Sequence, residues 1–458
     1  MHDQPNIIFI LCDDLGVNDL HCYGREDHHT PHLDRIAAEG TRFTSAYASQ
    51  AICSPSRAGL LTGLNPARLH LTTYLPGRPD APSQRVLHPE IMMHVPLSIK
   101  TLPRYFNEIG YTTGLIGKWH IGKHPGPVEH GFDYVYHPGE SKNTTPSETE
   151  GGKAEYELTR KTLSFIEANR DRPFLAYLGH YTPHIPYAAK NPLITKNGDA
   201  FEPVYAALIE TLDDTIGILD AKLEELGLAG NTILVITSDN GGLHVPEKPH
   251  KRVTHNTPFR AGKGFTYEGG QRVPLIMRWP GQIPAGRVVN TPVTNVDWIP
   301  SLRELVGSPV PGGLDGISWA SGLLGGTFPE RPLFWHFPHY TNQGGRPNGT
   351  MRDGQWLLVE RYDEEKAELY DLSVDIGEKE DVSKQYPERL ADMRAALDKW
   401  RKECRVQTNI PNPDCDEKKF RALYVDVDPS QFDPLKANEQ EWNRIHAWRD
   451  GMDEAIRK

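Results

Sequence analysis

Near the start of the chain, the stretch Asn6-Ile7-Ile8-Phe9-Ile10-Leu11 decides the fold class. It is a short, isoleucine-rich run that stops at Asp13-Asp14, and such a run is typical of a buried strand. Strands that are apolar throughout belong to sheets covered on both faces, and these sheets are mostly parallel. We therefore expect a mostly parallel sheet with helices on both of its faces.

Strands and helices alternate through the first two-thirds of the chain. Further strands are predicted at Thr41–Ala46, Tyr111–Ile116, Phe174–Leu178, Thr232–Thr237 and Val273–Trp279. Helices are predicted from Thr30-Pro31 to Gly40, and at Pro55–Thr62, Ser98–Ile109, Glu155–Asn169 and about Glu202–Leu226. This alternation predicts an α/β fold in which a large, mostly parallel mixed sheet is sandwiched by helices.

The organisation of the chain changes after about residue 325. Short strands joined by turns, as in an antiparallel meander, are predicted at Leu333–Phe337, Gln355–Arg361 and Glu368–Leu372. A helix is predicted at Pro387–Cys404, and the polar tail beyond it has no strong period. We predict a catalytic α/β domain over residues 1–325. Residues 326–458 would form a smaller α+β subdomain with antiparallel strands, a helix and a tail that wraps the surface. Loops rich in proline and glycine are predicted at Leu75–Ser83, His124–Pro127 and Gly344–Gly349.

Composition excludes some classes of function. The 458 residues are 38% hydrophobic and 24% charged, so a sizeable core can form. The chain has 50 Lys and Arg against 61 Asp and Glu, a net charge of −11, which argues against a nucleic-acid binder. A local basic pocket can still bind an anionic substrate.

Membrane and secretion signals are not visible in the sequence. The early apolar run Ile7–Cys12 is far shorter than the ~20 residues that span a bilayer. Met1-His2-Asp3 lacks the basic start of a signal peptide. A trimmed signal would make the protein periplasmic or secreted, and otherwise it would be cytoplasmic, so the compartment stays open. Among the five cysteines, Cys404 and Cys415 are close enough to pair under oxidising conditions, or they are free thiols.

Polar side chains follow three of the predicted strands. Asp13-Asp14 ends the first strand, Asp239-Asn240 follows Thr232–Thr237, and Lys118 and His120 follow Tyr111–Ile116. In open α/β sheets, ligands bind beyond the carboxyl ends of the strands. Asp and Asn oxygens suit Ca²⁺ or Mg²⁺ rather than zinc. A single Asp pair more often caps a helix or lines a turn, but the second Asp-Asn favours a metal site.

The segment Cys53-Ser54-Pro55-Ser56-Arg57 carries the most information. With Pro55 at the first helical position, Cys53 lies just before a helix N-terminus, which favours anions and activates a nucleophile. Arg57 lies about one turn on and can offer a bidentate fork to a tetrahedral oxyanion. The alternative is that Cys53 is a small buried hydrophobic residue, as a lone cysteine usually is.

This segment, followed by Leu61-Thr62-Gly63, resembles the signature of the type I, formylglycine-dependent sulfatases of the alkaline phosphatase superfamily. Other landmarks of that family follow in order. They are Asn6–Leu15, Gly117-Lys118-Trp119-His120, Thr182-Pro183-His184-Ile185-Pro186, Ser238-Asp239-Asn240-Gly241, Gly262-Lys263-Gly264 with Glu268–Pro274, and Glu368-Leu369-Tyr370-Asp371-Leu372. The resemblance spans residues 6 to about 382 and implies the alkaline phosphatase-like fold.

The resemblance implies the following chemistry. A separate formylglycine-generating enzyme oxidises Cys53 to Cα-formylglycine, whose hydrate, a geminal diol, attacks sulfur and leaves a sulfated hemiacetal. One divalent cation, Ca²⁺ or else Mg²⁺, binds to Asp13, Asp14, Asp239, Asn240 and the modified Cys53. Asp239 accepts the proton of the attacking hydroxyl, and His184 and Lys263 act on the leaving group. His120 removes the second proton to expel sulfate, while Arg57 and Lys118 stabilise the oxyanion.

These residue types suit sulfate-ester hydrolysis, because cationic side chains and a metal neutralise charge in a water-poor pocket. A serine or thiol nucleophile would retain a stable sulfated adduct, whereas a geminal diol expels it through its second hydroxyl. Each residue also has a plain structural alternative. Lys263 could be a surface lysine in a glycine turn, and His184 could simply fill a loop between prolines. For Glu268 and Arg272 we expect a structural ion pair.

The substrate is predicted from polar, aromatic loops at residues 72–82, 244–256 and 336–348. Arg78, His94, His255 and Arg346 are candidates to bind further sulfates or a uronate, and Trp319, Trp335 and Tyr340 to stack on a sugar ring. Such loops favour an exo-acting carbohydrate sulfatase, with the sulfate position left open. The alternatives are an arylsulfatase, a phosphonate or phosphodiester hydrolase of the same superfamily, and a non-catalytic sulfated-glycan binding protein with an unmodified Cys53.

Overall fold

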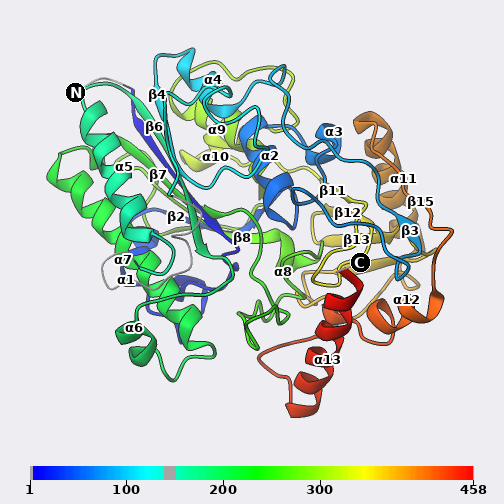
Figure 1. The fold of residues 1–458 in the computed structure, drawn as a ribbon. Coiled ribbons are helices and arrows are strands. Elements are labelled where there is room, and N and C mark those ends of the chain that lie inside the picture. The colour runs from blue at the N-terminus through cyan, green and yellow to red at the C-terminus, as the bar shows by residue number, and fades with distance from the viewer. Residues whose placement is uncertain (1–3, 139–150, 457–458) are drawn as a thin grey trace.

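The computed structural model describes residues 4–138 and 151–456 (Figure 1). Met1-His2-Asp3, on which the expectation about a signal peptide partly rests, lies outside these residues. The described chain forms a nine-stranded mixed sheet, a separate four-stranded antiparallel sheet and one two-stranded ribbon. Helices cover the large sheet on both faces, so the predicted fold class is confirmed.

Five neighbouring strands of the large sheet are parallel. β1 (Asn6–Asp13) is buried along its whole length and lies between β6 (Phe174–Pro183) and β7 (Thr232–Ser238). β4 (Thr112–Gly117) and β5 (Tyr134–Tyr136) extend the sheet beyond β6. The carboxyl ends of these strands therefore meet at one edge of the sheet.

The other side of the sheet contains the one antiparallel strand that separates its parallel parts. β8 (Arg272–Arg278) runs antiparallel both to β7 and to β2 (Thr41–Tyr47). β9 (Arg287–Val289) and β10 (Val293–Thr294) pair in parallel with β2 at the border. Because β8 is reversed, its first residue, Arg272, lies at the edge where the parallel strands end.

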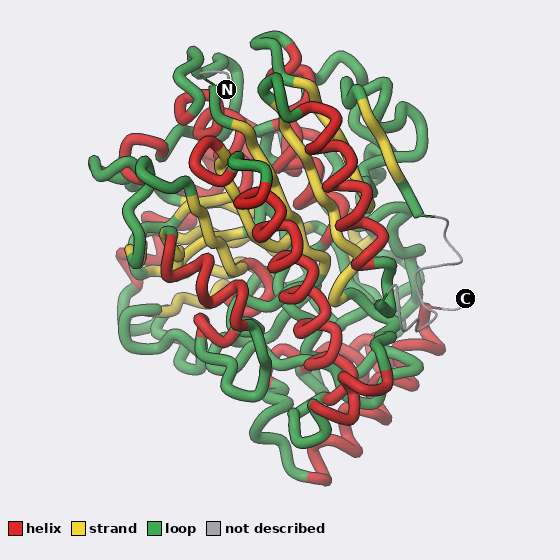
Figure 2. Tube along the Cα trace, turned by 90° about the vertical axis from the view of Figure 1, so that its left-hand side faces the viewer, coloured by secondary structure: helices red, strands yellow, loops and turns green. Residues whose placement is uncertain are grey.

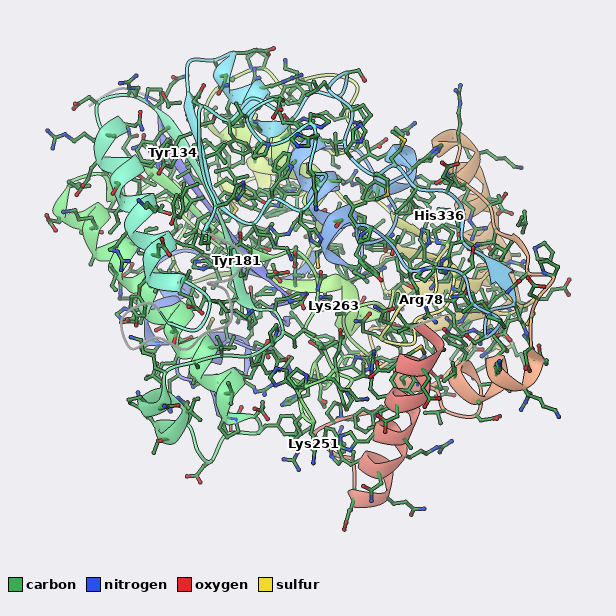
Figure 3. All side chains as sticks on the ribbon, in the orientation of Figure 1. Arg78, Tyr134, Tyr181, Lys251, Lys263 and His336 are labelled. Carbon is green, nitrogen blue, oxygen red and sulfur yellow. The ribbon has the colours of Figure 1, made fainter. Side chains whose placement is uncertain are left out.

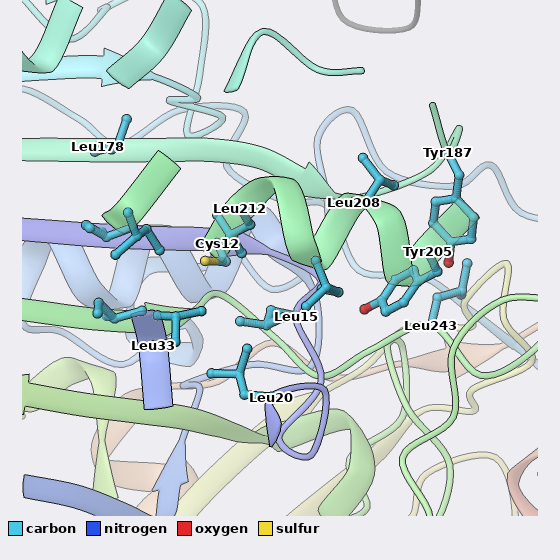
Figure 4. Packing of buried hydrophobic residues seen from close by; sticks show 14 of the residues in the cluster. Cys12, Leu15, Leu20, Leu33, Leu178, Tyr187, Tyr205, Leu208, Leu212 and Leu243 are labelled. Carbon is cyan, nitrogen blue, oxygen red and sulfur yellow. The ribbon is translucent and has the colours of Figure 1, made fainter. Parts of the chain in front are cut away.

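Successive residues of β1 enter opposite hydrophobic cores, as the period of a strand requires. Ile8 and Ile10 pack into the core under α1 (Pro31–Glu39), α5 (Glu155–Asn169) and α7 (Pro203–Glu225). Ile7, Phe9 and Leu11 pack into the opposite core with α4 (Leu102–Asn107), α9 (Trp298–Leu305) and α10 (Ala320–Leu323). Figure 2 shows long helices crossing in front of the strands, and Figure 4 shows Leu212 of α7 beside Cys12 of β1.

The predicted helix boundaries agree with the structure only in part. Helix α5 has the predicted ends, whereas the helix predicted at Ser98–Ile109 is shorter, because α4 begins only at Leu102, with Pro103 in its first turn, and the chain turns at Gly110. Short helices also form at α3 (Pro66–Leu69), α6 (Asn191–Lys196) and α8 (Glu268–Gln271). Within the described ranges, no helix is both long enough and apolar enough to cross a membrane.

The four-stranded sheet consists of β11 (Leu333–Phe337), β12 (Asn348–Asp353), β13 (Trp356–Arg361) and β14 (Ala367–Asp371), in that order. Helix α11 (Pro387–Cys404) packs against it through Met393 and Leu397. β12 was not predicted, and the loop expected at Gly344–Gly349 ends two residues early, because this polar strand begins at Asn348.

The tail, in whose sequence no strong period was found, contains regular structure. β15 (Ile410–Pro411) pairs with β3 (Val86–Leu87), and the helices α12 (Glu417–Tyr424) and α13 (Glu439–Ile456) follow. Buried residues of both helices belong to the same core as Ile8 and Ile10 of β1. The division at residue 325 stays a prediction. Cys404 and Cys415 are both free thiols.

We predict that Leu212→Ala destabilises the protein strongly. Leu212 of α7 is fully buried in the hydrophobic core between this helix and the sheet. Truncation removes apolar contacts and leaves a cavity, which should lower the free energy of unfolding by about 2–5 kcal/mol. The control is Ile218→Ala on the same helix, because Ile218 is 40% exposed. Denaturant unfolding of the two variants measures the difference, and equal losses would contradict this account of the core.

Candidate active site

The carboxyl edge of the large sheet gathers the predicted site residues. Asp13 ends β1, Asp239 follows β7, Lys118 follows β4 and His184 follows β6. Cys53 is the first residue of α2 (Cys53–Thr62), a helix buried at every position. This helix starts two residues earlier than predicted, with Pro55 in its first turn rather than at its start. Cys53 still lies at the positive end of the helix dipole.

Three buried ion pairs hold the site together. The Lys118 ammonium lies 2.6 Å from an oxygen of Asp13, and the Lys263 ammonium lies 2.7 Å from an oxygen of Asp14. The third pair joins Arg57 Nε to Asp239 Oδ2 at 2.7 Å. Each of these three cations, predicted to stabilise the oxyanion (Arg57, Lys118) or to act on the leaving group (Lys263), therefore lies against a predicted metal-binding carboxylate. Figure 3 shows Lys263 near the centre of the molecule.

The donor set suits a hard divalent cation. Potential ligand atoms of Asp13, Asp14, Cys53 and His184 all lie within 4.8 Å of one another. Two further oxygens, Asp13 Oδ1 and Asn240 Oδ1, are buried without a hydrogen-bond donor among the described residues. Free carboxylate and amide oxygens are what Ca²⁺ or Mg²⁺ requires. His184 joins this cluster, although the sequence pointed to Asp239 and Asn240 instead.

Asp239 is already engaged at both carboxylate oxygens. Its Oδ1 accepts a bond from the backbone N–H of Asp14 at 3.2 Å, and its Oδ2 accepts the bond from Arg57. Burial raises the pKa of Asp239 to about 6, against the opposing effect of Arg57. Asp13 behaves differently: burial alone would raise its pKa, but Lys118 and His184 hold it well below the usual range. The two carboxyls thus differ in proton affinity within one pocket.

Cys53 is not activated as a thiolate. Burial raises the pKa of its thiol to about 12, and the neighbouring Lys118 and Lys263 oppose that rise only in part. An unmodified Cys53 is therefore a neutral thiol, and neutral thiols are weak nucleophiles.

The two histidines face the site in defined ways. His184 Nδ1 lies 2.5 Å from the Ile185 carbonyl, which can only accept, so Nδ1 carries a proton and Nε2 points toward Asp14 at 3.7 Å. His120 has a left-handed backbone with φ 65°, and its Nδ1 is buried with no partner in the described part of the chain. Burial lowers the pKa of both imidazoles.

The four substrate candidates stay predictions. Arg78 donates to the Thr341 carbonyl at 2.9 Å, and Arg346 is paired with Asp363 at 2.9 Å. Figure 3 shows Arg78 on the side of the C-terminal helices. His255 packs edge-on against Phe201, and the side chain of His94 lies against Gly122, two residues after His120.

The prediction that three aromatic residues stack on a sugar ring is wrong. Trp319, Trp335 and Tyr340 are each at most 2% exposed, so none has a face free to stack on a sugar. The structural ion pair expected between Arg272 and Glu268 is confirmed, with Arg272 Nε donating to Glu268 Oε2 at 2.6 Å.

One charged residue near the site was missed. Lys153 is 3% exposed, and Asp13, Lys118 and Asp14 are among the charges that act on it. In the sequence it stands only as a lysine after Gly151-Gly152, ahead of a helix, and nothing there marks it as a site residue.

Comparisons with known proteins agree with this geometry. The profile of the Sulfatase family matches residues 5–308, and that of N-sulphoglucosamine sulphohydrolase, C-terminal, matches residues 261–404. The chain is 33% identical to N-acetylgalactosamine-6-sulfatase of Canis lupus familiaris, over 72% of this chain and 68% of that protein. It is 32% identical to arylsulfatase A of Homo sapiens, over 82% of each chain.

A solved structure shares the fold. The crystal structure of Ps i-CgsB in complex with k-i-k-neocarrahexaose superposes with a TM-score of 0.74 at 28% identity, and the match covers 87% of this chain and 93% of that chain. Together with the family match over most of the chain, the arrangement of Cys53, its three cations and the carboxylate cluster leads to one conclusion: the chain belongs to the sulfatase family and is a sulfuric ester hydrolase.

Proposed function

We propose that the protein removes sulfate from the end of a sulfated carbohydrate. The observation that carries the proposal is the position of Cys53, at the N-terminus of a buried helix and among the ligand atoms of Asp13, Asp14 and His184. The similarity to an N-acetylgalactosamine-6-sulfatase, and to a protein solved in complex with k-i-k-neocarrahexaose, favours a sugar substrate.

We infer that Cys53 acts after conversion to formylglycine by a separate maturation enzyme of the producing cell. The raised pKa of its thiol supports this, because the unmodified side chain would attack sulfur poorly. Once converted and hydrated, the residue supplies a hydroxyl that attacks sulfur and a second hydroxyl that allows sulfate to leave.

One Ca²⁺, or else Mg²⁺, would be held by Asp13, Asp14, Asp239, Asn240 and the modified Cys53, with His184 close by. The oxygens Asp13 Oδ1 and Asn240 Oδ1, which accept no hydrogen bond from a described residue, support this assignment. The ion would supply Lewis-acid stabilisation of negative charge on the sulfate oxygens.

Asp239 and His184 would move the protons of the first step. Asp239 accepts the proton of the attacking hydroxyl, since its carboxylate is among the charges that act on the Cys53 side chain. Because Nδ1 already donates to the Ile185 carbonyl, His184 donates to the departing alcohol from Nε2 and must carry both ring protons in that step, a form that the nearby Asp14 favours and burial opposes. Lys263 stands beside Asp14 on the same side and stabilises the leaving oxygen.

His120 would remove the proton that releases sulfate. Its lowered pKa keeps the imidazole neutral near pH 7, as a base must be. Arg57 Nη2 donates no hydrogen bond to a described residue and lies 3.8 Å from Asp13 Oδ1, so that nitrogen could still donate to a sulfate oxygen. Lys118 supplies a second positive charge there.

Two alternatives share this machinery. An arylsulfatase is favoured by the 32% identity to arylsulfatase A, and a phosphonate or phosphodiester hydrolase would use the same nucleophile. A non-catalytic glycan-binding protein would keep an unmodified Cys53.

The proposal is tested by sulfate release from a panel of sulfated mono- and oligosaccharides, phenyl sulfate and phenyl phosphonate. Protein co-produced with a formylglycine-generating enzyme, and shown by mass spectrometry to be converted, should release sulfate from a sugar. Cys53→Ala should lose at least about 1,000-fold in turnover, since the nucleophile is gone. Cys415→Ala is the control and should keep its turnover. Converted protein active only on phenyl sulfate or phenyl phosphonate would exclude the carbohydrate assignment.

We also predict that chelation lowers both turnover and thermal stability. A cation that binds only the folded protein stabilises it by about 2.7 kcal/mol at a hundredfold excess over its Kd. Exhaustive treatment with EDTA should lower the melting temperature of the wild type, and added Ca²⁺ should restore it. Asn240→Ala should show a smaller shift between the two conditions. A wild type with the same turnover and melting temperature after verified metal removal would rule out this cation site.

His184→Ala should discriminate between leaving groups. Loss of a general acid costs about 10²–10⁴-fold on a sugar sulfate, whose alcohol must be protonated as it leaves. The loss on nitrophenyl sulfate should be much smaller, because nitrophenolate leaves without a proton. His446→Ala on α13 serves as the control. Equal losses on the two substrates would remove His184 from the role of proton donor.

A further inference from the structure

Lys153 is a buried lysine that the proposed mechanism does not use. It follows Gly151-Gly152 and precedes α5. Here the chain lies very close to the segment that follows β6, because a Cβ on Gly152 would lie 1.4 Å from the Ala188 carbonyl oxygen. Only glycine fits such an approach, so the backbone before Lys153 is tightly constrained.

The buried carboxylate of Glu155 fixes the position of Lys153. One oxygen of Glu155 accepts the backbone N–H of Lys153 at 2.8 Å, and the other accepts the Thr182 hydroxyl at 2.6 Å. Thr182 lies at the end of β6, two residues before His184. Glu155 therefore ties Lys153 to the strand that carries the proposed proton donor.

The Lys153 side chain is close enough to the reaction site to be affected by its charges, but it takes no part in the ion pairs there. Asp13, Glu155 and Lys118 are among the charges that act on it, and it acts in turn on His250. Lys118 and Lys263 lie within 2.7 Å of site carboxylates, whereas Lys153 forms no ion pair or side-chain hydrogen bond with any described residue.

Among the described residues, Lys153 is thus a buried cation with no ion-pair partner. The three carboxylates of the site already have Lys118, Lys263 and Arg57 as their cations, and a bound divalent ion would add still more positive charge. Burial lowers the pKa of Lys153 to about 8, against the opposing pull of Asp13. A nearly buried ammonium gains most from an anion that the protein itself does not supply.

We propose that Lys153 is a specificity-determining residue that binds a second anionic group of the substrate, a carboxylate or a further sulfate, beside the sulfate that is cleaved. This inference rests on the proposed function. The cleaved sulfate already has Arg57, Lys118 and Lys263, whereas the nearly buried Lys153 has no ion-pair partner among the described residues. The preferred substrate is accordingly a sugar that carries two negative charges close together.

The test compares singly and doubly charged substrates. The probes are N-acetylgalactosamine 6-sulfate, its 4,6-disulfate, and a disaccharide in which a uronate adjoins the 6-sulfated sugar. Lys153→Met should raise KM about tenfold for at least one doubly charged probe and less than about threefold for the singly charged one, with kcat within about threefold of wild type. Lys153→Arg should restore the preference. The doubly charged probe that responds identifies the second anion as sulfate or carboxylate.

Other outcomes overturn the inference. Equal KM increases on all probes, or a general fall in kcat, would assign Lys153 to the cleaved sulfate, and unchanged kinetics would leave it structural. Thermal unfolding checks folding, and Lys153→Gln replaces the Met variant if that one does not fold.

Binding separates this inference from the proposed function. If wild type releases sulfate from none of the sugars, the proposed function fails. Calorimetry on Cys53→Ala, with and without Lys153→Met, then measures binding of the same probes. Weaker binding of a doubly charged probe alone would support Lys153 as the site of the second anion, and equal binding would refute it.

Discussion

The pairing of buried charges at the carboxyl edge of the sheet is the constraint on which the site depends. Three carboxylates leave water there, and a buried carboxylate is tolerable only beside a cation or a metal. Asp13 and Asp239 come from the adjacent strands β1 and β7, while Arg57 comes from α2. The elements that deliver these side chains must therefore end at this edge, and the parallel order of the central strands makes them do so.

The backbone at this edge is strained where it turns side chains into the site. Asp14 and His120 adopt left-handed conformations, with φ of 68° and 65°, at a cost of order 1–3 kcal/mol each. Gly117 permits the turn before His120, because a Cβ there would lie 2.0 Å from the Gly179 carbonyl. The hydrophobic packing of both sheet faces supplies the stability that keeps these conformations in place.

Sequence reasoning succeeded where a pattern is local. The apolar runs of β1 and β7 and the ends of α5 were readable from neighbouring residues alone. The polar strand β12 and the charged helix α13 were not, although Trp442, Ile445, Trp448 and Met452 recur there at helical spacing. Burial of Trp335 and the position of Lys153 depend on contacts between distant segments, such as that of Glu155 with Thr182, and no local pattern encodes them.

Contacts between distant segments also shape the surroundings of the charged site residues. The charged machinery lies within residues 13–263, but the surroundings of Lys263 are built by the C-terminal part of the chain. The Thr341 hydroxyl lies 3.3 Å from the Gly264 carbonyl, and Arg449 of α13 donates to the Asn342 carbonyl at 2.6 Å. The tail thus holds segment 341–342 against the turn that bears Lys263. In the proposed mechanism the alcohol leaves on that side, so changes in the tail would alter which substrate fits without disturbing the buried ion pairs of the site.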